Sequence, residues 1–134
     1  MFRLCTILCK QAHFSEQINL YGPQTVITLV NHHSREELVG AVVRDSIALA
    51  NNPVIKFFAF EFHAETKHMQ WERLSLLMDR IESERRRHQF FIRPLEGKKI
   101  TENEIQHGIF RTSCMDCLDR TNVIQVNCWL HNCR

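Results

Sequence analysis

The chain has 134 residues, of which 44% are hydrophobic and 24% charged, and its formal net charge is +2. This composition suits one globular domain or part of a larger one, and it excludes a disordered chain. A net charge so close to zero does not by itself point to any class of partner.

The cysteines and the first residues bear on the cellular compartment. The six cysteines are Cys5, Cys9, Cys114, Cys117, Cys128 and Cys133. The apolar stretch from Leu4 to Cys9 is closed by Lys10, and it is too short for a secretory signal or a membrane span. We therefore expect a reducing compartment in which the cysteines are free thiols.

The first half of the chain predicts a strand followed by a helix. Residues 24–30 (QTVITLV) are rich in β-branched side chains, which favour a strand. Ser34 and Glu37 have the spacing of a capping box and predict the start of a helix, and residues 51–53 (NNP) predict its end. The apolar residues that share one face of this helix are Leu38, Val42 and Leu49.

The second half predicts two further strands and two further helices. Residues 54–62 (VIKFFAFEF) are almost continuously apolar, which predicts a strand buried on both faces. Residues 67–87 predict a helix, residues 108–112 a short strand and residues 120–130 a last helix, and we expect His88 at the surface. The expected core residues of the 67–87 helix are Met69, Trp71, Leu74, Met78 and Ile81.

This alternation of strands and helices predicts an α/β fold with a mainly parallel sheet flanked by helices. In such sheets a ligand binds beyond the carboxyl ends of the strands. The segment that begins at Cys114 leaves the carboxyl end of the third strand, and His63 and Glu65 leave that of the second. We therefore expect these residues to face one cleft.

Residues 111–122 (RTSCMDCLDRTN) combine thiols, carboxylates and cations between the third strand and the last helix. Cys114 and Arg120 have the spacing Cys-x5-Arg, and a loop of this length can turn its backbone N–H groups inward to bind an anion. The following helix adds its positive end, and Arg120 can grip two phosphate oxygens. The loop residues expected to contact such an anion are Met115, Cys117, Leu118 and Asp119.

The same field acts on the thiol of Cys114. A free thiol has a pKa of about 8.5, which a helix N-terminus and a cation lower. The thiolate of Cys114 would attack a bound phosphorus atom and form a phosphocysteine, with Thr121 donating a hydrogen bond to the sulfur. No metal or other cofactor is required, because Arg120 and the N–H groups stabilise the charge.

Three further polar side chains have two interpretations each. A protonated Asp116 or Asp119 can act as general acid, or each can cap the helix or pair with an arginine. For Asp119 the structural interpretation is favoured, and for Asp116 the two stay open. His63 can position a bound phosphate ester, but a histidine at a strand end is more often an exposed polar residue.

Other sequence features support rival hypotheses. Cys114-x2-Cys117 and Cys128-x4-Cys133, with His131, have the spacing of zinc ligands. Cys114-x2-Cys117 also has the spacing of a redox pair, although its Met-Asp insert is unusual. The run at residues 85–88 (RRRH) complements a helix dipole or attracts anionic lipid. Nucleic-acid binding is disfavoured, since aromatic residues do not alternate with the basic ones.

Three stretches also resemble a known family. Residues 108–125 (GIFRTSCMDCLDRTNVIQ) closely resemble the signature of the Sac-domain phosphoinositide phosphatases. Residues 60–74 (FEFHAETKHMQWERL) and 21–31 (YGPQTVITLVN) resemble two more blocks, so that the likeness covers roughly residues 17–126. The chain is most similar to the members in endoplasmic reticulum and Golgi membranes, which act on phosphatidylinositol 4-phosphate.

The resemblance implies a function and roles for single residues. It implies removal of a phosphate from the inositol ring of a lipid, without a metal, at the cytoplasmic face of those membranes. Cys114 matches the nucleophile of the family, Arg120 the phosphate-binding arginine, and Asp116 a loop aspartate that assists catalysis. The implied partners are a phosphoinositide substrate and an anionic membrane surface.

The chain also departs from the family pattern. Ser113 stands where asparagine is usual and Glu61 where aspartate is usual. An amino-terminal subdomain, further catalytic sequence and membrane spans of the family are not matched, and residues 126–134 do not resemble it. We therefore expect residues 1–134 to be a single partial domain from a truncated, spliced or incomplete product. The alternative function is an inactive fragment that binds a phosphoinositide or a protein.

Overall fold

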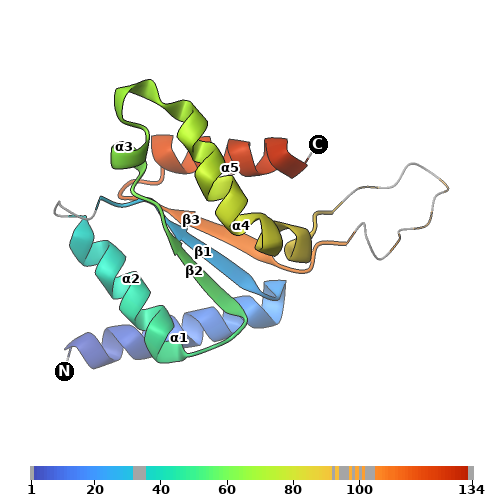
Figure 1. Cartoon of the computed structure of the whole chain (residues 1–134). Coiled ribbons are helices and arrows are strands. Elements are labelled where there is room, and N and C mark those ends of the chain that lie inside the picture. The colour runs from blue at the N-terminus through green and yellow to red at the C-terminus, as the bar shows by residue number, and fades with distance from the viewer. Residues whose placement is uncertain are drawn as a thin grey trace.

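A computed structural model describes residues 2–31, 36–91, 93, 97, 99, 101 and 105–132 of the chain. A three-stranded sheet is covered by helices on both faces (Figure 1), which confirms the α/β class. The elements are α1 (Phe2–Tyr21), β1 (Gln24–Thr28), α2 (Glu37–Ala50), β2 (Ile55–Ala59), α3 (Phe62–Glu65), the 3-10 turns η1 (Lys67–Met69) and η2 (Trp71–Arg73), α4 (Leu74–His88), β3 (Ile109–Ser113) and α5 (Asp119–Asn132).

The sheet has the order β2-β1-β3, and both pairings are parallel. Thr28 at the end of β1 pairs with Ala59 of β2 and with Ser113 of β3. The three strands therefore end level with one another. The segments that follow them start from the same edge of the sheet, where α/β proteins bind their ligands.

The central strand β1 is buried along its whole length and contributes to a core on each face. On one face, α1 and α2 pack on a core that contains Phe14, Val26, Ile47 and Ile55. On the other face, α4 and α5 pack on a larger core that contains Ile27, Leu29, Phe60, Phe62, Leu74, Leu77, Met78, Ile81, Cys114 and Ile124. Adjacent residues of β1 serve opposite cores because side chains alternate along a strand.

The helix α1 was not among the elements predicted from the sequence. It packs against α2, and Phe14 is the only buried residue among its described side chains. Gly22 ends it with a positive φ of 76°, and the Gly22 N–H bonds the carbonyl of Ile18 over 2.9 Å. A helix that buries so little of its surface needs no broad apolar stripe, and hydrophobic periodicity therefore does not reveal it.

The prediction that β2 is buried on both faces is wrong. It is an edge strand, and the side chain of Lys56 is exposed. The apolar run at residues 54–62 suggested one strand, but it contains both β2 and the first residue of α3. Phe60 and Phe62 lie beyond the strand and anchor the start of α3 in the core of α4 and α5.

The predicted apolar face of α2 is also wrong. Leu38, Val42 and Leu49 are 75%, 42% and 58% exposed. The helix instead packs through Gly40 and Ile47. A Cβ at Gly40 would lie 2.6 Å from Val30 Cγ2, so close approach at a glycine decides which face is inward. Ser34 of the predicted capping box lies outside the described residues.

The α-helix predicted from residue 67 begins at Leu74. His68 and Met69 have positive φ values of 58° and 61°, which no α-helix accommodates, and the chain forms η1 and η2 there. Met69 and Trp71 are 75% and 47% exposed, so their expected place in the core is wrong. The rest of the predicted stripe is confirmed, since Leu74, Met78 and Ile81 are buried.

His88 is buried, although its sequence position suggested the surface. Its Nε2 and the Thr25 Oγ1 share a hydrogen bond of 2.7 Å, and its ring meets that of Phe110 at 5.1 Å between centroids. A Cβ at Gly108 would lie only 2.2 Å from His88 Nδ1, so this contact requires glycine. Burial lowers the pKa of His88, opposed by the charge of Glu84.

We predict that His88 makes the stability of the fold fall in mild acid. A histidine with a lowered folded-state pKa contributes its full stability above its unfolded pKa of about 6.5 and loses it as the pH falls towards the folded value. The urea midpoint of the wild-type chain should therefore decrease between pH 7.5 and pH 5.5, and His88→Gln should remove most of that decrease. The exposed His107 provides the control, since His107→Gln should keep the wild-type slope; equal slopes for all three proteins would contradict the prediction.

Candidate active site

The loop after β3 is held at both of its ends. The N–H of Leu29 bonds the carbonyl of Ser113 over 2.8 Å, which continues the pairing of β1 and β3 up to the loop. At the far end, the N–H of Asn122 bonds the carbonyl of Leu118 over 3.1 Å and forms the first turn of α5. Cys117 has a positive φ of 58°, so the chain reverses sharply within the loop.

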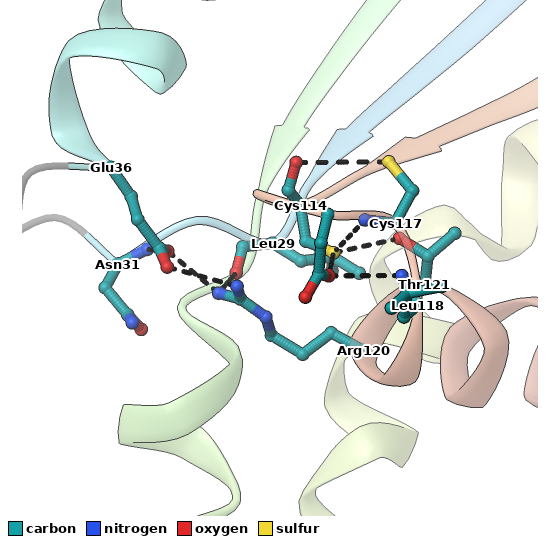
Figure 2. A network of polar contacts seen from close by, with 9 residues as sticks. Leu29, Asn31, Glu36, Cys114, Cys117, Leu118, Arg120 and Thr121 are labelled. Atoms are coloured by element: carbon teal, nitrogen blue, oxygen red, sulfur yellow. Dashed lines mark hydrogen bonds and ion pairs between the residues drawn. The ribbon is translucent and has the colours of Figure 1, made fainter.

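Cys114 lies at the bottom of this loop with its residue surface only 5% exposed. Its Sγ accepts the backbone N–H of Cys117 over 3.1 Å and the hydroxyl of Thr121 over 3.3 Å (Figure 2). The hydrogen bond expected from Thr121 is thus present. Both donors, together with the amino end of α5, favour negative charge on the sulfur.

Asp116 turns its carboxylate back over the loop. Its Oδ1 accepts the N–H of Leu118 over 3.1 Å and lies 3.4 Å from the Sγ of Cys114, which donates to it. The Leu118 N–H, followed by the Cys114 thiol, lowers the pKa of this carboxyl. Asp116 is therefore ionised at neutral pH and can accept the thiol proton, while it occupies one N–H expected to bind an anion.

Arg120 is buried at the start of α5, and its guanidinium lies against Glu36 (Figure 2). Nη1 donates to Glu36 Oε2 over 2.8 Å, and Nη2 donates to Glu36 Oε1 over 3.1 Å. Nη1 also donates to the carbonyl of Leu29 over 3.3 Å. The hydrogen bond with Glu36 is the main cause that raises the pKa of Arg120, and the charges of Glu36, Cys114 and Asp116 make smaller contributions. Sulfur, carboxylate and guanidinium therefore belong to one electrostatic site.

Glu36 was not predicted from the sequence. It immediately precedes α2, and its Oε2 also accepts the N–H of Asn31 over 3.1 Å. The hydrogen bond from Arg120 is the main cause that lowers the pKa of Glu36, with a smaller contribution from the charge of His63. An acidic residue between the carboxyl end of β1 and α2 is the signal that could have identified it, because such segments line α/β sites.

The remaining predicted residues differ in whether they contribute to this site. His63 is in α3, faces the ring of Phe62 edge-on, and lies within electrostatic range of Glu36. Glu65 does not join the site, because it forms an ion pair of 2.6 Å with Arg73. Asp119 is the first residue of α5, which suits a role at the helix terminus. Met115 and Leu118 are 58% and 60% exposed on the loop.

The described thiols are neither part of a group of metal ligands nor joined in disulfides. Within the described part of the chain, no three His, Cys, Asp or Glu side chains are grouped so as to hold a metal ion. Cys133 of the zinc hypothesis lies outside that part. Cys9, Cys114, Cys117 and Cys128 are free thiols. Burial raises the pKa of Cys128 to about 11, and its Sγ lies 4.0 Å from the sulfur of Met78, so it acts as a packing residue.

We predict that Thr121→Val slows alkylation of Cys114 by iodoacetamide at least about tenfold at pH 7, because a hydrogen bond to a charged group contributes about 1.5–3 kcal/mol. Valine keeps the shape of threonine and removes only the donor to the sulfur. Fragment-ion mass spectrometry assigns the label, and Cys117 in the same peptide is the internal control, since its rate should not change. An unaltered rate at Cys114 would show that the hydroxyl does not stabilise the thiolate.

Comparison with known proteins agrees with the signature read from the sequence. The SacI homology domain family matches residues 6–67. Phosphatidylinositol-3-phosphatase SAC1 of Drosophila melanogaster is 39% identical over 113 residues, which are 84% of this chain and 19% of that protein. Phosphatidylinositide phosphatase SAC2 of Mus musculus is 36% identical over 123 residues, which are 90% of this chain and 10% of that protein. The chain thus spans about a fifth or less of the length of these relatives, and it belongs to the Sac-domain phosphoinositide phosphatase family.

Proposed function

We propose that this chain hydrolyses the phosphomonoester of phosphatidylinositol phosphates, with phosphatidylinositol 4-phosphate favoured, through a phosphocysteine on Cys114. The observation that supports the proposal lies at the carboxyl edge of the parallel sheet. There the Cys114 sulfur accepts two hydrogen bonds, and the Arg120 guanidinium lies within electrostatic range of it. This combination suits attack on a dianionic phosphate ester without a metal.

In the first step, Cys114 gives its proton to the ionised Asp116, 3.4 Å away, and the sulfur attacks phosphorus. The S–P bond forms as the bond from phosphorus to the inositol oxygen breaks. Asp116 then passes the proton to the leaving oxygen, so that the thiol proton ends on the inositol hydroxyl. In this scheme Asp116 is both base and acid, which extends the general-acid interpretation that the sequence left open beside the structural one.

In the second step, a water molecule attacks the phosphocysteine. The S–P bond breaks, Asp116 accepts a proton from the water, and inorganic phosphate leaves. Asp116 then returns this proton to the sulfur, which restores the resting thiol and the ionised carboxylate. Asp116 must release the N–H of Leu118 when phosphate arrives, because the two anions compete for the same donor.

The ring position of the substrate phosphate has two candidates. The family resemblance favours the 4-phosphate, whereas the relative from Drosophila melanogaster is named a phosphatidylinositol-3-phosphatase. The mouse relative is named only as a phosphatidylinositide phosphatase. The shared chemistry is a phosphomonoester on an inositol ring, and both isomers belong in the assay.

We further infer that the site edge docks on an anionic membrane, at the cytoplasmic face of the endoplasmic reticulum or Golgi. Met69 and Trp71 are exposed just after α3, and Trp71 packs on Phe62 with ring centroids 6.2 Å apart. Met115 and Leu118 expose further apolar surface on the loop itself. Exposed methionine and tryptophan suit the bilayer interface. None of the described helices is long and apolar enough to span a bilayer.

The arginines near the end of α4 do not strengthen the membrane inference. Arg85 and Arg86 both form ion pairs with Glu82, and Arg87 lies 3.5 Å from Glu84. Their charges are thus partly neutralised along their own helix. Their position in its last turn fits the complement to the helix dipole that the sequence suggested.

We predict that the wild-type chain releases inorganic phosphate from short-chain phosphatidylinositol 4-phosphate, with the 3-phosphate isomer assayed in parallel. Cys114→Ser should reduce the release by at least about 10³-fold, because an alcohol is the weaker nucleophile. Cys9→Ser, at an exposed free thiol of α1 outside the loop, is the control and should stay within about twofold of wild type. A quenched reaction should carry one phosphoryl group on Cys114 by mass spectrometry.

Two outcomes would contradict the hydrolase proposal. Equal release by the wild type and Cys114→Ser would show that another group is the nucleophile. Lipid binding without release of phosphate from either isomer would favour the alternative, a fragment that binds phosphoinositides without hydrolysing them.

We predict that Trp71→Ala lowers co-sedimentation of the chain with phosphatidylcholine vesicles containing phosphatidylinositol 4-phosphate by about threefold to tenfold, because apolar area buried in the interface is lost. Leu49→Ala is the control. Leu49 is 58% exposed near the carboxyl end of α2, at the opposite edge of the sheet. Equal losses for the two variants would argue against a docking surface at the site edge.

A further inference from the structure

The strongest feature outside the predicted constellation is the carboxylate that holds the phosphate-binding arginine. We propose that Glu36 is a positioning residue, which fixes the guanidinium of Arg120 in the orientation that receives the phosphate group. This inference rests on the proposed function and deepens it. It assigns a role in the site to a residue between the central strand β1 and α2, far in sequence from the loop that follows β3.

Among the described residues, the hydrogen bonds of Arg120 leave one edge of its guanidinium for a ligand. The group has five N–H bonds. Glu36 takes one from Nη1 and one from Nη2, and the carbonyl of Leu29 takes the second N–H of Nη1. The N–H of Nε and the second N–H of Nη2 are not used by these contacts. They lie parallel on one edge of the planar group, which is the fork that binds two phosphate oxygens.

The acceptors are themselves held by the central strand. Leu29 is fully buried, and its N–H is bonded to the carbonyl of Ser113. The Oε2 atom of Glu36 accepts the N–H of Asn31, two residues further along the same segment. The plane of the guanidinium is therefore fixed against backbone groups that follow β1, rather than against a freely moving side chain.

Burial makes this orientation matter energetically. The side chains of Arg120 and Glu36 are only 10% and 19% exposed. A guanidinium in such a place needs a partner, because an unpaired charge away from water is costly. Without the carboxylate, Arg120 would turn towards solvent or towards the nearby carboxylate of Asp116. In either case the Nε edge of the guanidinium would no longer be held in one orientation by Glu36 and the backbone after β1.

Glu36 could instead compete with phosphate for Arg120, and this role predicts the opposite change in phosphate affinity when the carboxylate is removed. A carboxylate beside Arg120 also repels a phosphate dianion, and removing a mere competitor would tighten phosphate binding. Removing a positioning group would weaken it. The donor count favours positioning, because Glu36 occupies the end of the guanidinium and leaves the side edge open. The sign of the change in phosphate affinity therefore decides between the two roles.

The test uses the full chain and the substitutions Glu36→Gln and Glu37→Gln. Glutamine keeps the size of the side chain but removes the charge and one acceptor. Glu37 is the matched control, since it is the next residue, exposed and acidic. Glu36→Gln should weaken binding of inorganic phosphate, measured by calorimetry, about threefold to tenfold and lower kcat/KM about 10-fold to 100-fold, mainly through kcat. Glu37→Gln should change neither quantity by more than about twofold.

A second pair of variants separates positioning from a structural role. If Glu36 acts through Arg120, adding Glu36→Gln to Arg120→Ala should cause no further loss of kcat/KM. A merely structural residue would lower activity in both backgrounds. The ¹⁵N spectrum of the arginine side chains gives a readout that needs no activity, since slowed rotation of the Arg120 guanidinium should be lost in Glu36→Gln and kept in Glu37→Gln.

The outcomes also separate this inference from the proposed hydrolase activity. In one outcome, the wild type releases no phosphate from lipid while Glu36→Gln still binds inorganic phosphate more weakly than the wild type. That pair of results would contradict hydrolysis and support positioning. Phosphate binding that is unchanged or tighter in Glu36→Gln would overturn positioning, as would the lack of saturable binding to the wild type. A further loss of activity in the Arg120→Ala background would also overturn it.

Discussion

The level ending of three parallel strands is the constraint on which the rest of the site depends. Thr28 pairs with Ala59 on one side and with Ser113 on the other, so that the carboxyl ends of β1, β2 and β3 coincide. Segments that are far apart in the chain then start from the same edge. The first brings Glu36, the second brings His63, and the third brings the loop of Cys114. A shift of register in either pairing would separate the thiol from the groups that stabilise its charge.

Several hydrogen-bond donors of the site are paired with acceptors from the protein itself. Arg120 faces the carboxylate of Glu36, and the N–H of Leu118 faces that of Asp116. The Cys114 sulfur accepts from the N–H of Cys117 and from Thr121. Such pairing avoids unsatisfied polar groups in a partly buried site. The proposed phosphate would therefore displace Asp116 from the N–H of Leu118, whereas the Nε edge of Arg120 would receive it without breaking a hydrogen bond to Glu36.

The wrong predictions have physical causes in packing. Apolar periodicity placed Leu38, Val42 and Leu49 of α2 inside, yet the helix turns its Gly40 face inward because only glycine permits the approach to Val30. The continuous apolar run around β2 suggested a central strand, but its last phenylalanines serve α3. The hydrophobicity of a side chain indicates that the residue can be buried. Which partner buries it depends on elements elsewhere in the chain.

The sequence by itself determined the α/β order of most elements, the family, and the Cys-x5-Arg-Thr spacing around Cys114, because these depend on local pattern and on residues close together in the chain. The tertiary structure alone decided that Glu36 meets Arg120 across 84 positions of sequence, that His88 is buried on Thr25, and that Met69 and Trp71 are exposed. Contacts of this kind follow from how the helices pack on the sheet and from strand register, which no local pattern encodes.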